Sequence, residues 1–527
     1  MSTGNSHPLH SHKAITKSAG IIGFATLISR ILGFIRDIVI ARLFGVYVYA
    51  QAFVVAFKIP NLFRDLLGEG AANAAFVPVF TEYRVKHTEK EFWELANVVL
   101  NLLLVILTSI TLLGIIFSPV LVRLIAPGFA ADPAKLQATI TLNRIIFPYL
   151  LLICLAAYSM GLLNSLKHFA IPAFAPCLLN ISIIAFALIF GEGITGLAAG
   201  VLVGGVLQLA VQIPVLYKKG FRLNLFKKFD HSGARTIGRL MLPRLASSSI
   251  YQLNNFVDTI FGSLAFVVGD GGVAVLYFAY RLIQFPLGVF STALSQAILP
   301  TFSQQALEPG HDDLKRTLSF GLRATFFVLL PSSVVFFVLS RPLIQVLFGG
   351  GRFDAYSISN TASALKFYSL GLVAYGLTKI LQSCFFALKD TYTPTKIAFI
   401  ALVMNVVLNA VLMFPMKIAG LALATSISGI VTAVILFASL YKRLMPYDLK
   451  DVLVSFLRVF LSSICMGAAC YLVCRNYEFS NAGIVFNIIS LTAILVIAAF
   501  IFIIFCFIFR VSEIKELWIW LTKRKVT

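Results

Sequence analysis

Charged residues are scarce in this chain, and acidic residues are the scarcest of them. Only 12% of the 527 residues are charged, with 22 Asp and Glu against 43 Lys and Arg. A soluble globular protein carries about 25% charged residues, because its surface must face water. The low charge and the 59% hydrophobic content exclude soluble and disordered proteins and indicate one polytopic membrane domain.

Residues that build catalytic or metal centres are also sparse. The seven cysteines all lie in apolar runs and form no CxxC pair, which excludes a disulfide framework and argues against a zinc site. A membrane-embedded transferase or phosphatase needs clustered carboxylates or a nucleophile–base pair. The acids of the apolar segments are scattered and no histidine accompanies them. The sequence therefore favours a transporter over an enzyme, and no cofactor is expected apart from a cation.

Long apolar segments dominate what is present. A spanning helix needs about 20 apolar residues, and about fourteen segments qualify, so the predicted fold is an all-α polytopic membrane protein. Proline in the second, eighth and ninth segments predicts bends there. The segments lie near 18–44, 48–83, 92–119, 137–165, 170–190, 194–217, 237–265, 272–302, 316–347, 358–388, 393–414, 417–441, 451–474 and 483–510.

Lysine and arginine are distributed unevenly over the connections between these segments. With a cytoplasmic N-terminus, nearly all of them fall on the cytoplasmic side, including the stretch 218–239 and the tail 515–525. The positive-inside rule then predicts that both termini are cytoplasmic. The stretch 221–239 mixes basic and apolar side chains, which predicts a segment on the membrane surface. A few cations remain outside: Arg123, Lys135, Arg352, Lys417 and Arg475.

The chain resembles itself at an offset of 222 residues. Ala75-Phe76-Val77-Pro78 resembles Ala297-Ile298-Leu299-Pro300, and Lys167 with Pro172 corresponds to Lys389 with Pro394. Six segments per half is an even number, so the halves should be parallel repeats around a central cavity, which favours alternating access. The predicted parts are an N-terminal tail 1–17, lobes 18–217 and 237–443, a basic amphipathic linker 218–236, two additional helices 444–510, and a tail 511–527.

Four arginines lie in early segments of the two halves: Arg30, Arg36, Arg64 and Arg281. A charged side chain at mid-bilayer costs about 2.5–3.5 kcal/mol, so each needs a partner or a water-filled cavity. Guanidinium groups recognise phosphate through forked hydrogen bonds. The arginines therefore predict a cavity for an anionic substrate, with phosphate or pyrophosphate as the natural candidate. No soluble basic domain is present that would bind nucleic acid.

The arginines have few acids nearby. Arg30 and Asp37 are seven residues apart on one helix face and are expected to pair, whereas Arg36 has no acid on its own face. The second segment adds the supporting charges Lys58 and Glu69. A snorkelling position near the membrane surface explains some of the cations equally well: Arg42, Lys58 and Arg341.

A second polar group is predicted in the other half. Asn405 and Asn409 share a helix face, and Thr425 and Asp258 lie on neighbouring segments. Meeting oxygen atoms can hold a cation such as Na⁺. Ordinary hydrogen bonds between helices explain the same residues equally well.

Several motifs resemble the MurJ/MviN family of lipid II flippases of bacterial peptidoglycan synthesis, within the multidrug/oligosaccharidyl-lipid/polysaccharide exporter superfamily. The resemblance runs over essentially the whole chain. It is carried by Ser29-Arg30-x-x-Gly33-Phe34-x-Arg36-Asp37, Ala52-Phe53-x-x-Ala56-Phe57-Lys58-Ile59-Pro60-Asn61-Leu62-Phe63-Arg64, Gly68-Glu69-Gly70-Ala71, Ala75-Phe76-Val77-Pro78 and Arg281-Leu282-x-x-Phe285-Pro286-x-Gly288-Val289.

The resemblance implies two six-helix lobes and a terminal helix pair that forms a groove for the lipid tail. It implies a cationic cavity that moves the pyrophosphate and sugar headgroup of lipid II to the outer face of the plasma membrane. The cavity arginines would be Arg30, Arg36, Arg64 and Arg281. A Na⁺ site would comprise Asp258, Asn405, Asn409 and Thr425. The implied partners are lipid II, membrane lipids and the cell-wall synthesis or division machinery.

This chain departs from the family pattern at four positions where the family commonly carries an acid: Gln51, Tyr280, Gln284 and Asn409. These losses make the cavity more positive and weaken the case for coupling to protons or to strongly bound Na⁺. Two alternatives to a lipid II flippase stay open. One is a flippase for another lipid-linked oligosaccharide, such as an O-antigen-like lipid, and the other is a scaffold, which predicts no need for buried arginine.

Overall fold

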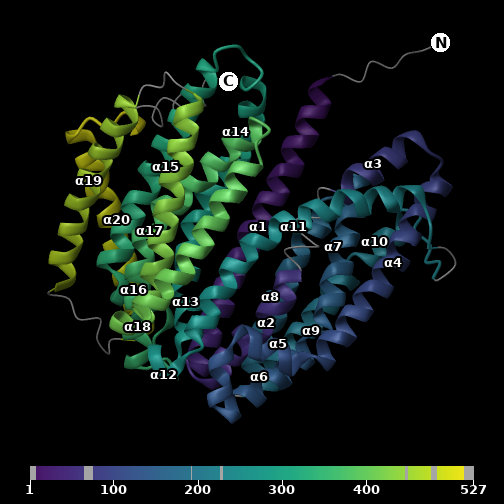
Figure 1. Cartoon of the computed structure of the whole chain (residues 1–527), viewed down its shortest axis with the longest axis horizontal. Coiled ribbons are helices and arrows are strands. Elements are labelled where there is room, and N and C mark those ends of the chain that lie inside the picture. The colour runs from purple at the N-terminus through teal and green to yellow at the C-terminus, as the bar shows by residue number, and fades with distance from the viewer. Residues whose placement is uncertain are drawn as a thin grey trace. The chain divides into compact units, whose positions relative to one another are not determined.

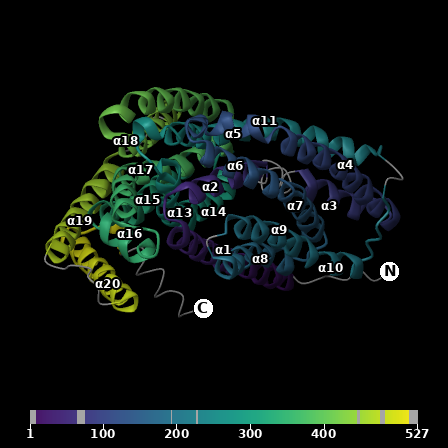
Figure 2. The same ribbon diagram turned by 90° about the horizontal axis from the view of Figure 1, so that it is seen from below.

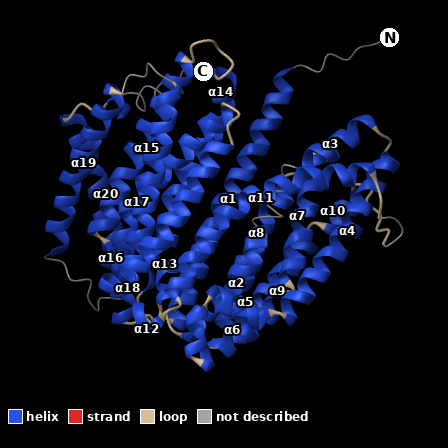
Figure 3. Cartoon of the chain, in the orientation of Figure 1, coloured by secondary structure: helices blue, strands red, loops and turns tan. Residues whose placement is uncertain are grey.

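The computed structural model of the chain describes residues 8–63, 75–191, 193–225, 229–444, 449–475 and 483–514, without the side chains of 8–19, 63, 242–255 and 484. This part is built of helices and loops (Figure 3), with one isolated bridge between Gly350 and Phe353. Ten of its helices are long and apolar enough to cross a membrane by length and composition. The predicted all-α polytopic fold is confirmed.

The chain divides into two compact units, and the first comprises Met1–Gln252. Within it, α8 packs along both α1 and α9 (Figure 1). The predicted segment 137–165 is two helices, α6 and α7, interrupted at Phe147 and Pro148. The helices of this unit are α1 (Pro8–Phe44), α2 (Val48–Phe63), α3 (Val77–Lys86), α4 (Glu89–Ile116), α5 (Ser118–Ile125), α6 (Pro133–Ile146), α7 (Tyr149–Ser165), α8 (Ala170–Phe190), α9 (Ile194–Ala210) and α10 (Ile213–Lys218).

The second unit comprises Leu253–Thr527, and the division falls within the long helix α11 (Ser232–Gly262). The helix α18 (Tyr392–Arg443) covers two predicted spans, because its backbone breaks at Lys417. The other helices of this unit are α12 (Ala265–Val268), α13 (Gly272–Pro286), α14 (Thr292–Gln305), α15 (Asp312–Val338), α16 (Ser340–Phe348), α17 (Ala355–Ala387), α19 (Lys450–Arg475) and α20 (Ile484–Ile508).

The 222-residue repeat recurs in the backbone. Lys167 after α7 and Lys389 after α17 both adopt left-handed φ angles, 59° and 58°. In each case the following residue donates its amide to the carbonyl five residues back, His168 to Leu163 and Asp390 to Phe385, both at 2.9 Å. This is the Schellman end of a helix, which usually uses glycine at the left-handed position. Equivalent lysines therefore close equivalent helices in the two units.

The predicted proline bends take different forms. Helix α13 ends at Pro286 and is followed by a π-helical turn, Leu287–Ser291, which is where such interruptions are expected. Helix α15 continues through Pro331 without a break. Next to that proline, the Ser332 hydroxyl donates to the Val328 carbonyl at 2.7 Å. Proline in a predicted span thus interrupted the eighth segment but not the ninth.

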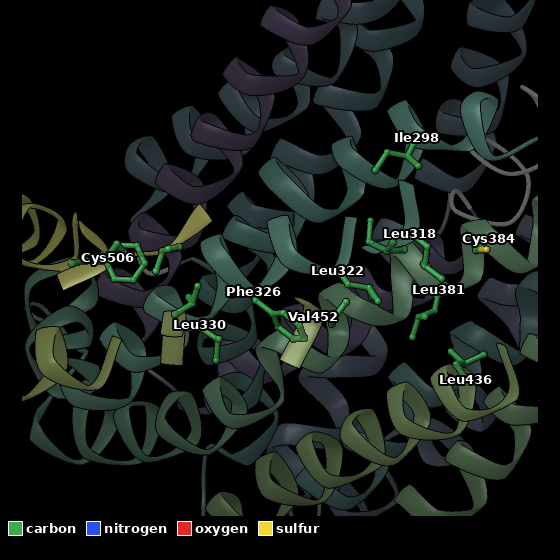
Figure 4. Packing of buried hydrophobic residues seen from close by; sticks show 14 of the residues in the cluster. Ile298, Leu318, Leu322, Phe326, Leu330, Leu381, Cys384, Leu436, Val452 and Cys506 are labelled. Atoms are coloured by element: carbon green, nitrogen blue, oxygen red, sulfur yellow. The ribbon is translucent and has the colours of Figure 1, made fainter. Parts of the chain in front are cut away.

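The core of the second unit connects its main helices to the last two. Buried side chains from α14, α15, α17, α18, α19 and α20 form one apolar cluster (Figure 4). Helices α19 and α20 lie beside α15 and α16 (Figures 1 and 2). A Cβ atom on Gly467 of α19 would overlap the Val334 side chain of α15, so glycine permits the close approach.

A polar contact ties the segment after α20 to the same core. Glu513 is buried, and its carboxylate accepts a 2.7 Å hydrogen bond from the Ser455 hydroxyl and lies 3.4 Å from the Arg323 guanidinium. The Arg458 guanidinium donates to the Arg510 carbonyl at 2.9 Å. The chain just beyond the last span is therefore held against α15 and α19.

Candidate functional site

The arginine cluster of the first unit is centred on Arg36 of α1. Its side chain is 5% exposed and donates two hydrogen bonds to Asp37 Oδ1, from Nη2 at 2.8 Å and from Nε at 3.0 Å. Asp37 is fully buried, and the Arg36 guanidinium lies 5.8 Å from the centre of the Phe57 ring. A forked contact of this kind stabilises both charges inside an apolar helix bundle.

The predicted pairing of Arg30 with Asp37 is wrong, and so is the prediction that Arg36 lacks a local acid. Seven residues span about 10 Å along a helix, so a shared face does not bring the two groups together. The flexible stem of Arg36 instead folds back onto the adjacent residue. Arg30 is exposed, and no ion pair joins it to any residue that the structure describes.

Asn180 of α8 completes the cluster from a neighbouring helix. Its Oδ1 accepts from Arg36 Nη1 at 3.1 Å, and its Nδ2 donates to the Ser29 carbonyl at 3.1 Å. Gly33 packs against the same amide, since a Cβ atom there would lie 3.7 Å from it. One side chain thus fixes both the guanidinium and the backbone of α1.

The remaining first-unit candidates are less well defined. Lys58 lies on α2 and is half-buried. Arg64 and Glu69 lie outside the described residues. Of the three arginines predicted in this unit, the structure therefore places one in a buried ion pair and one at an exposed position.

Arg281 is the candidate of the second unit and lies on α13. Its Nη1 donates to Gln284 Oε1 at 3.1 Å, one turn further along the helix, and its guanidinium lies 5.5 Å from the centre of the Tyr277 ring. The side chain is half-buried. An amide oxygen and an aromatic face thus orient this guanidinium.

The four residues of the predicted cation site do come together. Asp258 of α11 accepts from the Thr425 hydroxyl, which lies 3.1 Å from both carboxylate oxygens, and from Asn409 Nδ2 at 3.3 Å. Asn405 Nδ2 donates to Thr425 Oγ1 at 3.2 Å, and Asn409 Nδ2 also lies 3.1 Å from Asn405 Oδ1. Tyr368 of α17 adds its hydroxyl at 3.5 Å.

The oxygen atoms of this group suit a small hard cation. Asn409 is fully buried, and its Oδ1 finds no hydrogen-bond donor in the described part of the chain. With the Asp258 carboxylate and the Thr425 hydroxyl, it offers the oxygen ligands that such ions take. No cluster of three or more His, Cys, Asp or Glu that would hold a transition metal occurs among the described residues.

Sequence reasoning missed Asn180 and Tyr368. Each is a polar residue within a predicted span, and such residues usually face a partner helix. That pattern was the available signal. It could not name the partner, because the partners, Arg36 and Asp258, are 144 and 110 residues away in the chain.

The family model described as lipid II flippase MurJ matches residues 40–493. A probable lipid II flippase MurJ of Buchnera aphidicola subsp. Acyrthosiphon pisum is 36% identical over 470 residues, which cover 88% of this chain and 91% of that protein. The lipid II flippase MurJ of Burkholderia cenocepacia is 35% identical over 431 residues, covering 80% and 83%.

Solved structures give the same answer for the fold. A lipid II flippase MurJ in an inward closed conformation matches with a TM-score of 0.78 and 27% identity, over 94% of this chain and 99% of that chain. An inward-facing multidrug resistance MATE family transporter of the MOP superfamily shares the fold at 17% identity, with a TM-score of 0.65 over 79% and 94% of the two chains. This multi-pass membrane protein belongs to the lipid II flippase MurJ family.

Proposed function

We propose that this protein moves lipid II, the undecaprenyl-pyrophosphate-linked precursor of peptidoglycan, from the cytoplasmic to the outer face of the plasma membrane. The observation that carries the proposal is the family match, which spans residues 40–493 and is accompanied by the MurJ fold. The Burkholderia relative is described as a lipid II flippase and the Buchnera relative as a probable one, so a flippase for another lipid-linked oligosaccharide is not favoured.

The headgroup would be recognised through its pyrophosphate by Arg30, Arg36, Arg64 and Arg281. Arg30 is exposed, and Arg281 is half-buried and held by Gln284 and Tyr277. Each carries the guanidinium donors that suit phosphate oxygens. Arg36 is already bound by Asp37 and Asn180. Its contribution would be to fix α1, with Lys58 and Glu69 as supporting charges.

Transport would proceed by alternating access of two repeated lobes, 18–217 and 237–443, joined by the linker 218–236. The matching helix ends at Lys167 and Lys389 support a common origin for the lobes. Helices α19 and α20 would form the groove for the lipid tail, since they pack on α15 and α16. Alternating exposure of one site needs only rearrangement of packed lobes, so no covalent chemistry and no enzymatic activity are proposed.

A Na⁺ ion would be held by Asp258, Asn409 and Thr425, with Asn405 orienting the threonine. The unsatisfied Asn409 Oδ1 supports this assignment. An ion bound there would tie α11 to both halves of α18 by replacing hydrogen bonds with ion–oxygen contacts. Coupling of transport to such an ion would require that the two transport states bind it differently.

The orientation follows from charge. Both termini would be cytoplasmic, because Lys and Arg concentrate in the connections on that side. The outer face would receive lipid II for polymerisation, so the cell-wall synthesis or division machinery is the natural protein partner.

The central test uses cells whose own lipid II flippase is depleted and replaced by this chain. We expect the amount of lipid II accessible at the outer face to be restored. Arg30→Ala and Arg281→Ala should each abolish this restoration, because each removes a guanidinium of the proposed pyrophosphate site.

Arg341→Ala is the matched control, since Arg341 is an exposed arginine on α16 that is explained by snorkelling. Protein abundance is measured for every variant. An unchanged outer-face signal with the wild-type chain would refute the proposed function. Normal transport by both Arg30→Ala and Arg281→Ala would refute the site alone and would favour a scaffold role.

A further inference from the structure

The segment between α10 and α11 presents a basic and apolar surface that the flippase mechanism does not use. We call it the linker patch and define it by five exposed side chains: Lys218, Lys219, Arg222, Leu223 and Leu225. It follows directly on the span that ends at α10. The order of its backbone, its charge and its position along the membrane-spanning helix α4 together indicate what it contacts.

The backbone of the patch is held firmly against α4. Asn97 donates from Nδ2 to the Arg222 carbonyl at 3.0 Å and accepts from the Asn224 amide at 2.8 Å. One turn further along α4, Asn101 donates to the Asn224 carbonyl at 3.2 Å. We call these two asparagines the clamp, because their side chains hydrogen-bond to the backbone of the linker at residues 222 and 224. The linker backbone is therefore ordered before any ligand binds, which lowers the entropic cost of binding.

Aromatic contacts hold the beginning of the patch against α4. Phe221 is buried, and its ring centre lies 5.8 Å from that of Trp93 on α4. Gly220 supplies a φ of +102°, which turns the chain from α10 onto α4. The Arg222 guanidinium lies 5.9 Å from the centre of the Tyr217 ring and donates to the Tyr217 carbonyl at 3.0 Å. This cation is therefore presented in a fixed position.

The charge of the patch is not balanced within the described residues, where no acidic side chain forms an ion pair with Lys218, Lys219 or Arg222. The nearby Glu89 instead accepts from the Trp93 indole at 3.3 Å. Some exposed cations elsewhere have acidic partners: Lys86 with Glu82, Arg235 with Asp230, and Arg316 with Asp313. The three neighbouring cations of the linker patch have no such partner among the described residues, so the patch carries a net positive charge.

Two apolar side chains project beside these cations. Leu223 is 49% exposed and Leu225 is 43% exposed. In an extended segment, residues two apart point to the same side. Exposing leucine side chains to water is unfavourable. At a membrane interface, by contrast, the leucines can enter the acyl region while the cations contact the headgroups.

The depth of the patch fits such an interface. Its clamp residues, Asn97 and Asn101, lie between the charged start of α4 at Glu89 and the apolar run Leu102–Leu107. Trp93 lies at the same end of the helix, where tryptophan is typical of the membrane–water boundary. The linker therefore crosses α4 at the level of lipid headgroups.

We propose that the linker patch is a docking surface for the headgroups of anionic phospholipids, with its three cations on the phosphates and its two leucines in the outer acyl region. Basic side chains next to a membrane attract anionic lipid in this way. The surface would fix the linker to the bilayer independently of the transported substrate.

Trp93 provides a local reporter for the test. The chain has two other tryptophans, so the full-length protein carries Trp518→Phe and Trp520→Phe. Brominated phosphatidylglycerol, a quencher of indole fluorescence, is titrated into the purified protein in a zwitterionic micelle. We expect saturable quenching that weakens at high salt, and much weaker quenching by brominated phosphatidylcholine.

Neutralising the patch with Lys218→Gln, Lys219→Gln and Arg222→Gln should shift half-quenching about 100-fold higher in lipid, at about fivefold for each cation removed. Lys86→Gln with Arg316→Gln is the matched control, since it removes exposed cations that have acidic partners, and should leave the titration unchanged. Asn97→Ala with Asn101→Ala keeps every cation but releases the clamp, and should give an intermediate shift.

Three results would overturn the proposal. The first is equal quenching by the two lipids, and the second is an unchanged titration in the triple variant. The third is an equal loss in the control, because affinity would then follow net charge rather than this surface. None of these measurements depends on flippase activity.

Discussion

The two units place opposite charges at equivalent positions. Arg36 in the first unit and Asp258 in the second are 222 residues apart, the offset that also relates Pro78 to Pro300. Arg36 brings a cation that is bound by a neighbouring acid and by Asn180. Asp258 brings an acid that accepts hydrogen bonds from neutral groups.

The difference shows what each unit can bind at this position. In the first unit the guanidinium occupies the place between an acid and an amide oxygen, so a positive charge is built into the protein. In the second unit an acid, a hydroxyl and a buried amide oxygen meet, and this is where the proposed Na⁺ would bind. The repeat has thus preserved a polar position while changing it from a closed ion pair to a potential ion site.

The strongest way to break this comparison is to remove the acid of the closed pair. Asp37→Ala should lower the free energy of unfolding by about 3–5 kcal/mol, because it leaves a buried guanidinium without its counter-charge. The midpoint of chemical unfolding in detergent measures the loss. Glu82→Ala is the control, since it breaks the exposed pair with Lys86. An equal small effect for both variants would contradict a buried pair at Arg36.

A second pair of substitutions compares the buried asparagine of each unit, Asn180 in the first and Asn405 in the second. Asn180→Leu removes a hydrogen bond to the charged Arg36 and one to the Ser29 carbonyl, and the bond to the charged group alone is worth about 1.5–3 kcal/mol. Asn405→Leu removes bonds only to the neutral Thr425 and Asn409 side chains, at about 0.5–1.5 kcal/mol each, so a smaller loss is expected. The same unfolding measurement gives both values. A larger loss for Asn405→Leu would reverse the comparison.

The third prediction sharpens the assignment of an open site to the second unit. Na⁺ at ten times its dissociation constant should stabilise the wild-type protein by about 1.4 kcal/mol relative to choline. Asp258→Asn should abolish this difference, and Asn409→Asp should enlarge it by adding a carboxylate. Thermal unfolding in the two salts is the measurement. Na⁺ stabilisation that survives in Asp258→Asn would place the ion elsewhere.

The smallest expected effect tests whether the helix ends at Lys167 and Lys389 are equivalent in the two units. Lys167→Gly and Lys389→Gly should each change the free energy of unfolding by less than about 1 kcal/mol, with the same sign. Glycine relieves the left-handed strain of about 1–2 kcal/mol but adds freedom to the unfolded chain. The unfolding midpoints of the two variants measure these changes. The corresponding Lys→Ala variants are the controls. Opposite signs would mean that the two helix ends are not equivalent.

Much of the fold could be predicted because apolar length and the repeat are properties of the sequence itself. The fourteen predicted segments correspond to helices or pairs of helices, with residues 64–74 outside the described part. The break at Lys417 falls where two spans were predicted to meet. The gathering of Asp258, Asn405, Asn409 and Thr425 was also predicted, since helices close in the chain carry three of the four residues.

The contacts of the arginines were harder to predict. Helical spacing gives the face of a side chain but not its reach, and so Arg36 was assigned no acid although Asp37 is its neighbour. The role of Asn180 depends on the packing of α8 against α1, which no local pattern specifies. Tyr368 was missed for the same reason.

The buried contact of Glu513 has a consequence for the synthesis of the protein. Its partners, Arg323 and Ser455, precede Glu513 in the chain and are therefore synthesised before it. Chains are made from the N-terminus, and their parts fold as they emerge. The apolar packing of α19 on α15 can therefore form before this polar contact, which is added only after α20 has been synthesised.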